Sequence, residues 1–461
     1  MKLFNTLSRQ IENLQPVHRD KVTIYSCGPT VYDYPHIGNW FTFIRYDLLI
    51  RTLLASGFKP KWVMNITDVG HLTSDSDAGE DKLAKGARRE GKNAWDVAAF
   101  YSHYFLDALQ KLNFSHTDYL PRATDNIPEQ IEMIAQLEKA GFTYRVDDDG
   151  IYYDISKFDH YGRLAGLHPE HEQEELQRIT HNPLKRHQAD FALWKFSPKD
   201  VQRDMEWDSP WGKGFPGWHI ECSAMCRKFL GESIDIHCGG VDHIPIHHTN
   251  EIAQSEALSH KPLARIWMHS NHLLIDDQKI AKSLGNSINL EELEKRGFSP
   301  EVLRLLVLES HYRNQSKFSW QNMQAAKARL LNYHNFAARR FQASNRTEST
   351  VHSPELLKAM QEDLNSPLAL QHLDNFLNQT AESELGRKLI EQVIQDVDNL
   401  FGLKLSEVQD ISKEQKKMIC DREAARTAKD WTTADAIRSQ LAKGHISVLD
   451  TPQGPRWVYT D

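Results

Sequence analysis

Three separate stretches of the sequence carry residue types that bind soft metal ions. These residues are the cysteines Cys27, Cys222 and Cys226, the histidines His247 and His248, and Glu251. Zinc sites in proteins use about four ligands drawn from cysteine, histidine and carboxylate side chains. Because residues four apart lie on one face of a helix, His247 and Glu251 are able to bind one ion together. The pattern predicts a zinc site, but spacing does not choose between Cys222 and Cys226 or between His247 and His248.

A second set of residues is typical of phosphate binding. The motif HIGN opens a predicted helix, and the first backbone N–H groups of a helix lack partners and favour anions. In this motif Gly38 would allow close approach and His36 would donate a hydrogen bond. The motif KIAKS contributes Lys279 and Lys282, which would stabilise a leaving pyrophosphate. The chain has neither GxGxxG nor GxxxxGK[ST], so neither a dinucleotide fingerprint nor a P-loop explains these glycines.

The elements predicted around Cys27 form a βαβ unit. The segment KVTIYSC predicts a strand, FTFIRYDLLIRTLLASG predicts a helix that ends at Gly57, and KPKWVMNITDV predicts a second strand. Such a unit implies a parallel sheet whose ligands bind at the C-terminal edge of the strands. Cys27 and Asp68 fall at this edge. We therefore expect an α/β fold built on a Rossmann-like parallel sheet.

The distribution of strand and helix patterns divides the chain into four parts. We expect a Rossmann-like catalytic domain over 1–120 and 215–287, interrupted by an insertion over 121–214. Helical periodicity with few glycines predicts a helical bundle over 288–405. The last part, 406–461, predicts a charged helix and a hairpin that turns at Pro-Gln-Gly-Pro, a small helix-plus-hairpin domain.

The composition bounds the class of protein. A length of 461 residues is too great for one core. A formal net charge of −8 provides no global basic field for nucleic acid, although local basic patches would still bind a nucleic acid. Five scattered cysteines are too few for a disulfide framework and fit reduced thiols in a cytosol. No signal-peptide core and no apolar run of roughly 18 residues is present. We expect a cytoplasmic protein without a membrane span.

The motifs together resemble those of a known family. HIGN is similar to the HIGH signature and KIAKS to the KMSKS signature of class I aminoacyl-tRNA synthetases. The segments CGPTVYDYPHIGN, NITDV, GWHIECSAM, HHTNEIAQS, WMHSN and AKSLGN resemble cysteinyl-tRNA synthetases specifically, and the likeness continues to DTPQGPRW near the end of the sequence. The sequence departs from the signatures at Asn39, where HIGH has its second histidine, and at Ile280 and Ala281, where KMSKS has methionine and serine.

The resemblance implies roles for the residues at matching positions. It places the zinc ligands at Cys27, Cys222, His247 and Glu251. It places the contacts to substrate cysteine at Thr67, Trp218, His237 and Asp242. It places the ATP contacts at His36, Gly38, Asn39, Lys279, Lys282 and Ser283, of which His36, Asn39 and the two lysines are catalytic. The implied cofactors are one Zn²⁺ per chain and Mg²⁺ with ATP, and the implied partners are L-cysteine, ATP and tRNA-Cys. We expect a monomer.

The implied reaction has two steps. The cysteine carboxylate attacks the α-phosphate of Mg-ATP, and the 2′-hydroxyl of the terminal tRNA adenosine then attacks the cysteinyl-adenylate. A pocket that reads shape alone separates cysteine from serine by roughly 10–200-fold, whereas zinc favours a soft thiolate over a hydroxyl. Four protein ligands would already close a tetrahedron, so a substrate thiolate must add a fifth ligand or displace one, most readily Glu251.

The tail of the chain is expected to contact the tRNA. The resemblance implies that the helical bundle bridges to the acceptor arm and that the C-terminal domain recognises the anticodon. Arg456, Trp457 and Tyr459 are typical of residues that stack on single-stranded bases. The same three residues are equally compatible with packing inside the hairpin.

Other functions fit part of the pattern. A ligase that joins activated cysteine to an amino-sugar would share the catalytic domain but would not need the C-terminal segment. A zinc hydrolase would use Glu251 to activate water and would leave KIAKS without a role. A nucleic-acid-binding protein with a purely structural zinc would bind tRNA without activating cysteine.

Overall fold

The computed structural model gives the fold of most of the chain. These residues fall into two compact units, one formed by Met1–Leu290 with Tyr312–Lys317 and the other by Glu291–His311 with Phe318–Asp461. The division into four domains stays a prediction. The described residues are 1–70, 81–166, 183–198, 203–275, 278–279, 287–343, 352–451 and 454–460.

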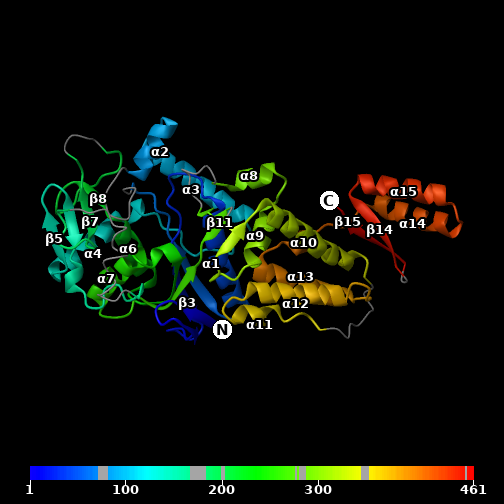
Figure 1. The fold of residues 1–461 in the computed structure, drawn as a ribbon, viewed down its shortest axis with the longest axis horizontal. Helices are drawn as coiled ribbons and strands as arrows, with labels where there is room; N and C mark the ends of the chain where they lie inside the picture. Colours follow the sequence, from blue (N-terminus) through cyan, green and yellow to red (C-terminus); the bar gives the residue numbers. More distant parts are fainter. Residues whose placement is uncertain are drawn as a thin grey trace. The chain divides into compact units, whose positions relative to one another are not determined.

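A four-stranded parallel sheet forms the centre of the first unit (Figure 1). Its strands, in spatial order, are β10 (Ala264–Ser270), β9 (Ile234–Gly240), β3 (Lys21–Ser26) and β4 (Lys59–Met64). All seven residues of β9 are buried, as expected for a central parallel strand covered on both faces. The helix α1 (Ile37–Ala55) connects β3 to β4, so the predicted βαβ unit and the α/β fold class are confirmed.

The first turn of α1 is closed by a capping box. The side chain of His36 accepts a hydrogen bond from the N–H of Asn39, and the side chain of Asn39 accepts one from the N–H of His36. These bonds satisfy backbone groups that the helix itself leaves unpaired. The asparagine that departs from the HIGH signature therefore has a structural role at the start of α1.

The remaining elements of the first unit surround the parallel sheet. A second, antiparallel sheet of order β5-β6-β7-β8 begins in the predicted insertion and extends past its end at residue 214 through β8, and β5 and β6 form a hairpin at Asp-Asp-Asp-Gly. Helix α6 leads into β9 and helix α7 leads into β10, which returns the chain to the parallel sheet. The bounds are β1 (Lys2–Asn5), β2 (Gln10–Asn13), α2 (Lys82–Glu90), α3 (Ala94–Lys111), α4 (Ile127–Lys139), β5 (Thr143–Val146), β6 (Gly150–Tyr153), β7 (Phe191–Phe196), β8 (Gly214–Pro216), α6 (Trp218–Leu230), α7 (His247–Ser259), β11 (Leu273–Ile275), β12 (Gln278–Lys279) and β13 (Ser316–Phe318).

The second unit consists of helices followed by one hairpin. Among the described helices of the whole chain, none is long and apolar enough to cross a membrane. The helices α8 to α13 lie in the range of the predicted bundle. The single charged helix predicted after it is wrong: the chain turns at Lys429, which has a φ of 60°, and forms two helices, α14 and α15, before the predicted hairpin. The bounds are α8 (Leu290–Lys295), α9 (Pro300–Leu308), α10 (Trp320–Ala338), α11 (Leu356–Gln361), α12 (Ser366–Gln379), α13 (Arg387–Phe401), α14 (Lys413–Thr427), α15 (Trp431–Lys443), β14 (Ile446–Thr451) and β15 (Gly454–Tyr459).

Trp457 packs inside the second unit. It pairs across the hairpin with Val448, and both side chains join a core cluster with Ile419 of α14 and Leu441 of α15. Only 4% of Trp457 is exposed, so it does not offer a face for a base to stack on. For this residue the packing interpretation is confirmed and the stacking interpretation is wrong, because the side chain alternation of the strand turns it inward.

Replacing Trp457 with alanine should therefore destabilise the C-terminal elements. We expect Trp457→Ala to lower the free energy of unfolding of this cluster by about 3–5 kcal/mol, the usual loss for a buried tryptophan. Hydrogen exchange of the α14 to β15 amides measures this change. Trp431, which is 57% exposed, provides the control: Trp431→Ala should stay within about 0.5 kcal/mol of the parent. Equal losses in both variants would contradict the packing.

Candidate active site

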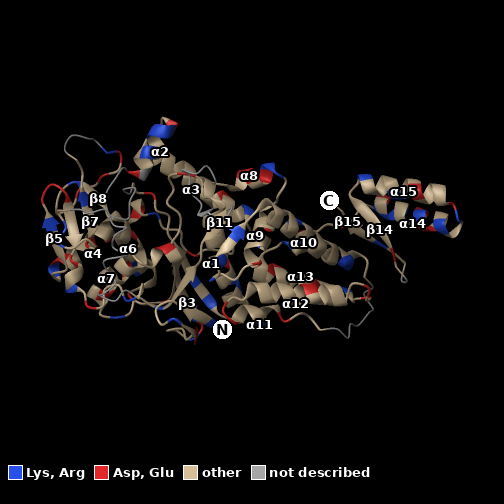
Figure 2. Ribbon diagram, viewed as in Figure 1, with Lys and Arg blue, Asp and Glu red and all other residues tan. Residues whose placement is uncertain are grey.

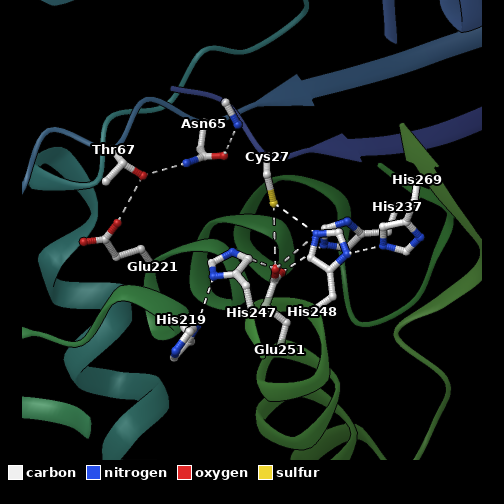
Figure 3. Close-up of polar contacts among 11 residues, drawn as sticks. Cys27, Asn65, Thr67, His219, Glu221, His237, His247, His248, Glu251 and His269 are labelled. Atoms are coloured by element: carbon white, nitrogen blue, oxygen red, sulfur yellow. Dashed lines mark hydrogen bonds and ion pairs between the residues drawn. The ribbon is translucent and has the colours of Figure 1, made fainter. Parts of the chain in front are cut away.

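Four potential metal ligands meet at the C-terminal edge of the parallel sheet. Figure 3 shows three of them, Cys27, His247 and Glu251. Cys27 directly follows β3, Cys222 lies in α6, and His247 and Glu251 lie one turn apart in α7. One ligand atom from each of the four lies within 4.8 Å of the others, and all four side chains are buried. Two thiols, an imidazole and a carboxylate are a donor set that suits zinc. Cys226 is buried one turn further along α6 and belongs to neither group of potential ligands found among the described residues.

Glu251 is held by histidines on both of its oxygens. His247 Nε2 lies 3.0 Å from Oε1, and His237 Nε2 lies 2.9 Å from Oε2. Burial by itself would raise the pKa of Glu251, but the charges and hydrogen bonds of His237 and His247 lower it below its ordinary value. Burial would likewise lower the pKa of His247, but Glu251 and Cys222 raise it to about 10. Glu251 is therefore an ionised carboxylate in a fully buried position.

The two cysteines differ in their ionisation. The hydrogen bond with Cys27 lowers the pKa of Cys222 to about 7, against the effect of burial. Burial raises the pKa of Cys27, and the neighbouring Cys222 and Glu251 add to this rise. Since the thiolate is the form that binds a metal, Cys222 provides one ligand in its binding form near neutral pH.

A second group of potential ligands shares two members with the first. This group is Cys27, His237, His248 and Glu251. His248 Nε2 lies 3.3 Å from the sulfur of Cys27, and its Nδ1 lies 2.8 Å from His269 Nε2. His269 in turn contacts the hydroxyl of Thr6 at 2.7 Å. Burial, with the charges of the neighbouring histidines, lowers the pKa of both His248 and His269, which keeps these rings neutral.

A cavity of about 510 Å³ opens beside the first group of ligands. Cys27, Cys222 and His247 line it, and so do three of the residues predicted to contact substrate cysteine, Thr67, Trp218 and Asp242. The fourth, His237, is fully buried and does not line it. The ring of His237 stacks on Trp267 with centroids 4.6 Å apart, and its side chain holds Glu251. His237 is therefore placed to act on the site through Glu251.

The predicted phosphate-binding residues lie only partly within the described chain. His36 and Asn39 line the same cavity, and Gly38 lies between them in the first turn of α1. Lys279 belongs to β12, where it pairs with Leu274 of β11. Lys282 and Ser283 lie outside the described residues. The structure thus brings the start of α1 and the cysteine-rich cluster to one cavity.

Sequence reasoning missed a network that joins β3, β4 and α6 (Figure 3). Asn65 accepts from the N–H of Gly28 at 2.9 Å and donates to the hydroxyl of Thr67 at 3.0 Å, and this hydroxyl lies 3.4 Å from Glu221. A side chain at Gly28 would place its Cβ 1.8 Å from the Asn65 carbonyl, so the close approach requires glycine. The signal for Asn65 was its place directly after β4, at the same sheet edge as Cys27.

Glu221 and His219 are further buried polar residues of α6 that the sequence did not indicate. Burial raises the pKa of Glu221, and the neighbouring Asp68 adds to the rise. His219 Nδ1 lies 3.0 Å from His247 Nδ1, on the ring edge opposite Glu251. Such contacts orient a metal-binding imidazole.

The fold and this site define a class of enzymes. Residues 13–328 match the family model described as the class I (C) tRNA synthetase catalytic domain. Two solved structures of methionyl-tRNA synthetase from Mycobacterium tuberculosis, bound to methionyl-adenylate, share the fold with TM-scores of 0.61 and 0.60. Each is 13% identical in sequence and covers 84% of this chain and 93% of its own. The chain has the fold and catalytic domain of a class I tRNA synthetase.

The full-length relatives narrow the class to one family. "Cysteine--tRNA ligase 1" of Burkholderia lata is 43% identical over 463 residues, which cover 99% of this chain and 96% of the relative. "Cysteine--tRNA ligase" of Treponema denticola is 39% identical over 489 residues, with 98% of each chain covered. Residues 408–457 also match the model of the cysteinyl-tRNA ligase anticodon binding domain. The chain belongs to the cysteine--tRNA ligase family, and the resemblance found in its sequence is confirmed.

Because the side chain of Asn65 bonds to both Gly28 and Thr67, removing it should destabilise the first unit. Asn65→Ala removes the acceptor of the Gly28 N–H and the donor to Thr67 in a side chain that is 1% exposed. We expect the free energy of unfolding of the first unit to fall by about 1–3 kcal/mol, measured by urea denaturation. The matched control is Gln110→Ala on the exposed face of α3, expected within about 0.5 kcal/mol of the parent. An unchanged stability of Asn65→Ala would show that the network contributes nothing.

Proposed function

We propose that this cysteine--tRNA ligase selects L-cysteine through one Zn²⁺ per chain, held by Cys27, Cys222, His247 and Glu251. The observation that carries the proposal is the meeting of these four buried ligands beside the cavity at the sheet edge. When bound, zinc supplies a soft Lewis acid that favours the thiolate of cysteine over the hydroxyl of serine. His247 is preferred to His248 because its group includes Cys222, which lines the cavity.

The protein side chains orient the amino acid in the cavity. Thr67, Trp218 and Asp242 would contact the substrate, and the carboxylate of Asp242 suits its ammonium group. The ring of Trp218 lies 4.5 Å from the ring of His247, so the two side chains support each other at the cavity wall. His237 would act by holding Glu251 in place, which also determines whether this carboxylate yields when the substrate thiolate arrives.

The ATP side of the site is assigned to the two signature motifs. His36, Gly38 and Asn39 would bind the nucleotide at the start of α1, and Lys279, Lys282 and Ser283 would bind it from the KIAKS segment with Mg²⁺. The substrate carboxylate attacks the α-phosphate in line, while His36, Asn39 and the two lysines stabilise the charge of the departing pyrophosphate. No covalent bond to the enzyme is required, so catalysis rests on positioning and on electrostatics.

The second step transfers cysteine to the 2′-hydroxyl of the terminal adenosine of tRNA-Cys. We assign catalysis to 1–120 and 215–287, the insertion to 121–214, contact with the tRNA stem to 288–405 and anticodon recognition to 406–461. The match of 408–457 to an anticodon binding domain supports this over the amino-sugar ligase, which needs no such domain. A monomer working in the cytoplasm is consistent with the free thiols of all five cysteines.

The proposed zinc site predicts different effects of substituting Cys222 and Cys226, which lie one turn apart in α6. We expect Cys222→Ser to lose zinc and cysteine-dependent ATP–pyrophosphate exchange together, because a serine hydroxyl stays protonated and is a poor zinc ligand. Cys226→Ser, its matched control one turn away, should keep both. Zinc content is measured by atomic emission and exchange with labelled pyrophosphate. Loss of zinc from Cys226→Ser, with Cys222→Ser intact, would reverse the assignment.

The reaction itself is tested by charging total tRNA with labelled cysteine, ATP and Mg²⁺. We expect cysteine to become esterified to tRNA and serine to be excluded by more than the roughly 200-fold that shape alone achieves. Removal of zinc by a chelator should abolish charging, and adding zinc back should restore it. Charging of serine at a comparable rate would contradict selection by the metal, and ATP-independent hydrolysis would indicate the hydrolase instead.

A further inference from the structure

The second unit contains a groove whose volume is about 670 Å³. This volume lies in the range of sites that hold small ligands. One wall is a stripe of α10 side chains, another is the C-terminal half of α12 with the residues after it, and the third is the hairpin of β14 and β15. The lining side chains with charge are Arg329, Arg339, Asp374 and Arg456. The helix α10 has no Lys or Arg in its last turn, and Arg339 and Arg340 follow it directly; Figure 2 colours Lys and Arg blue along the ribbon.

The hairpin is held against α10 and the residues that follow it by two pairs of amide hydrogen bonds. The side chain of Asn335 donates to the carbonyl of Tyr459 and accepts from its N–H, at 3.1 and 2.7 Å. The side chain of Gln342 does the same with Trp457, at 3.1 and 3.0 Å. Because these bonds satisfy the free edge of β15, they fix the hairpin as a wall of the groove.

The two faces of the hairpin have different surroundings. Trp457 and Val448, which pair across the strands, face the core cluster. The next pair, Arg456 and Leu449, together with Val458, lines the groove. Leu449 remains 41% exposed although it lies beside this cavity. A charged and an apolar side chain are therefore presented together on the groove side.

The three arginines of the groove are not equally neutralised. Arg329 forms ion pairs with Asp374 at 2.5 Å and with Glu309 at 3.0 Å. Arg339 instead donates to the carbonyls of Thr380 and Ser383, at 3.0 and 2.6 Å. Arg456 donates to the carbonyl of Ala381 at 2.6 Å. Within the described ranges, neither Arg339 nor Arg456 has a carboxylate partner.

These two arginines of like charge line one groove, are partly buried and donate to carbonyls that lie within four residues of one another. The Nε of Arg456 is buried and has no hydrogen-bond partner among the described residues. Burial, with the nearby charge of Arg456, lowers the pKa of Arg339 to about 10. Like charges that are held together in this way are stabilised by an anion between them. A guanidinium group binds two oxygens of one phosphate by paired hydrogen bonds, so a phosphate is an anion that suits this pair of arginines.

We propose that this groove binds the phosphodiester backbone of the tRNA, with a phosphate between Arg339 and Arg456. The amides of Asn332 and Asn378 and the apolar surfaces of Leu449 and Val458 line the same groove and would contact the adjoining sugar and base. The inference rests on the proposed function, since it takes the tRNA substrate as the source of the phosphate. It also explains how a chain with a net charge of −8 holds a polyanion, by a local patch.

The competing interpretation is that both arginines only cap the carbonyls that follow α12. Such a role would affect stability but would not depend on salt or on tRNA. A phosphate contact instead releases counterions, so removing it lowers the slope of log affinity against log salt by about one. The salt dependence therefore distinguishes the two roles.

The test measures the KM for tRNA-Cys in aminoacylation, at several salt concentrations, for Arg339→Gln and Arg456→Gln. We expect KM to rise about tenfold in each variant and the salt slope to fall by about one, while Arg456→Lys, which keeps the charge, should retain most of the slope. The matched control is Arg387→Gln on α13, an exposed arginine paired with Glu391, which should keep the parental KM. Parental KM and slope in both glutamine variants would overturn the proposal.

A second measurement uses the unaltered protein and does not depend on the variants folding. Phenylglyoxal modifies accessible arginines, and mass spectrometry reports the extent at each one. We expect tRNA-Cys to protect Arg339 and Arg456 but not Arg387. Protection by inorganic phosphate at equal ionic strength without protection by tRNA would assign the groove to a free phosphate and overturn the tRNA assignment, and no protection by either would overturn the site.

Cysteine-dependent pyrophosphate exchange of the unaltered protein keeps the two claims separable, because this step needs no tRNA. Absence of exchange in zinc-loaded protein would refute the proposed function. Exchange and charging with no effect of the arginine substitutions on KM would refute only the groove.

Discussion

The parallel pairing of β3 with β9 is the constraint on which the candidate active site depends. It aligns Ser26 with Cys238, and the N–H of Cys27 continues the ladder by donating to the Cys238 carbonyl at 3.1 Å. Since parallel strands end at the same edge, Cys27 comes to the edge from which the chain continues into α7. The helix α6 precedes β9 and supplies Cys222 to the same place. A shift of one residue in this pairing would turn Cys27 to the other face of the sheet.

The cluster at this edge places charge where water is excluded. An ionised carboxylate with no exposure, as in Glu251, is costly unless it is paired on both oxygens. His237 and His247 meet this need, and His219 and His269 extend the contacts to a further layer of side chains. Because His247 is held at both ring nitrogens, by Glu251 and by His219, this ligand is oriented before any metal or substrate binds. The free energy needed to bury and orient these side chains is therefore supplied by folding of the first unit.

In the second unit, side-chain amides form the hydrogen bonds that the backbone at one edge of β15 would otherwise lack. The side chains of Asn335 and Gln342 bond to the open edge of β15 in the place that a neighbouring strand would occupy. The alternation along β15 then directs Trp457 to the core and Arg456 to the groove. Neighbouring residues in the sequence therefore have unrelated roles, one in packing and the other at a polar surface. The interpretation of Arg456, Trp457 and Tyr459 from the sequence, as one set that either stacks on bases or packs in the hairpin, does not include this alternation.

The sequence alone determined the features that depend on local spacing. It indicated the α/β class, the βαβ unit at Cys27, the one-turn spacing of His247 and Glu251 and the resemblance to one family, because periodicity and motifs are written along the chain. It did not indicate Glu221 or the histidines His219 and His269, since a lone polar residue in a buried element carries no periodic signal. Spacing left Cys222 and Cys226 open and only the resemblance implied Cys222, whereas the tertiary structure brings Cys222 to Cys27 and Arg339 to the groove of Arg456. These contacts join elements far apart in sequence, and they are decided by the register of strands and the rotation of packed helices, which no local pattern specifies.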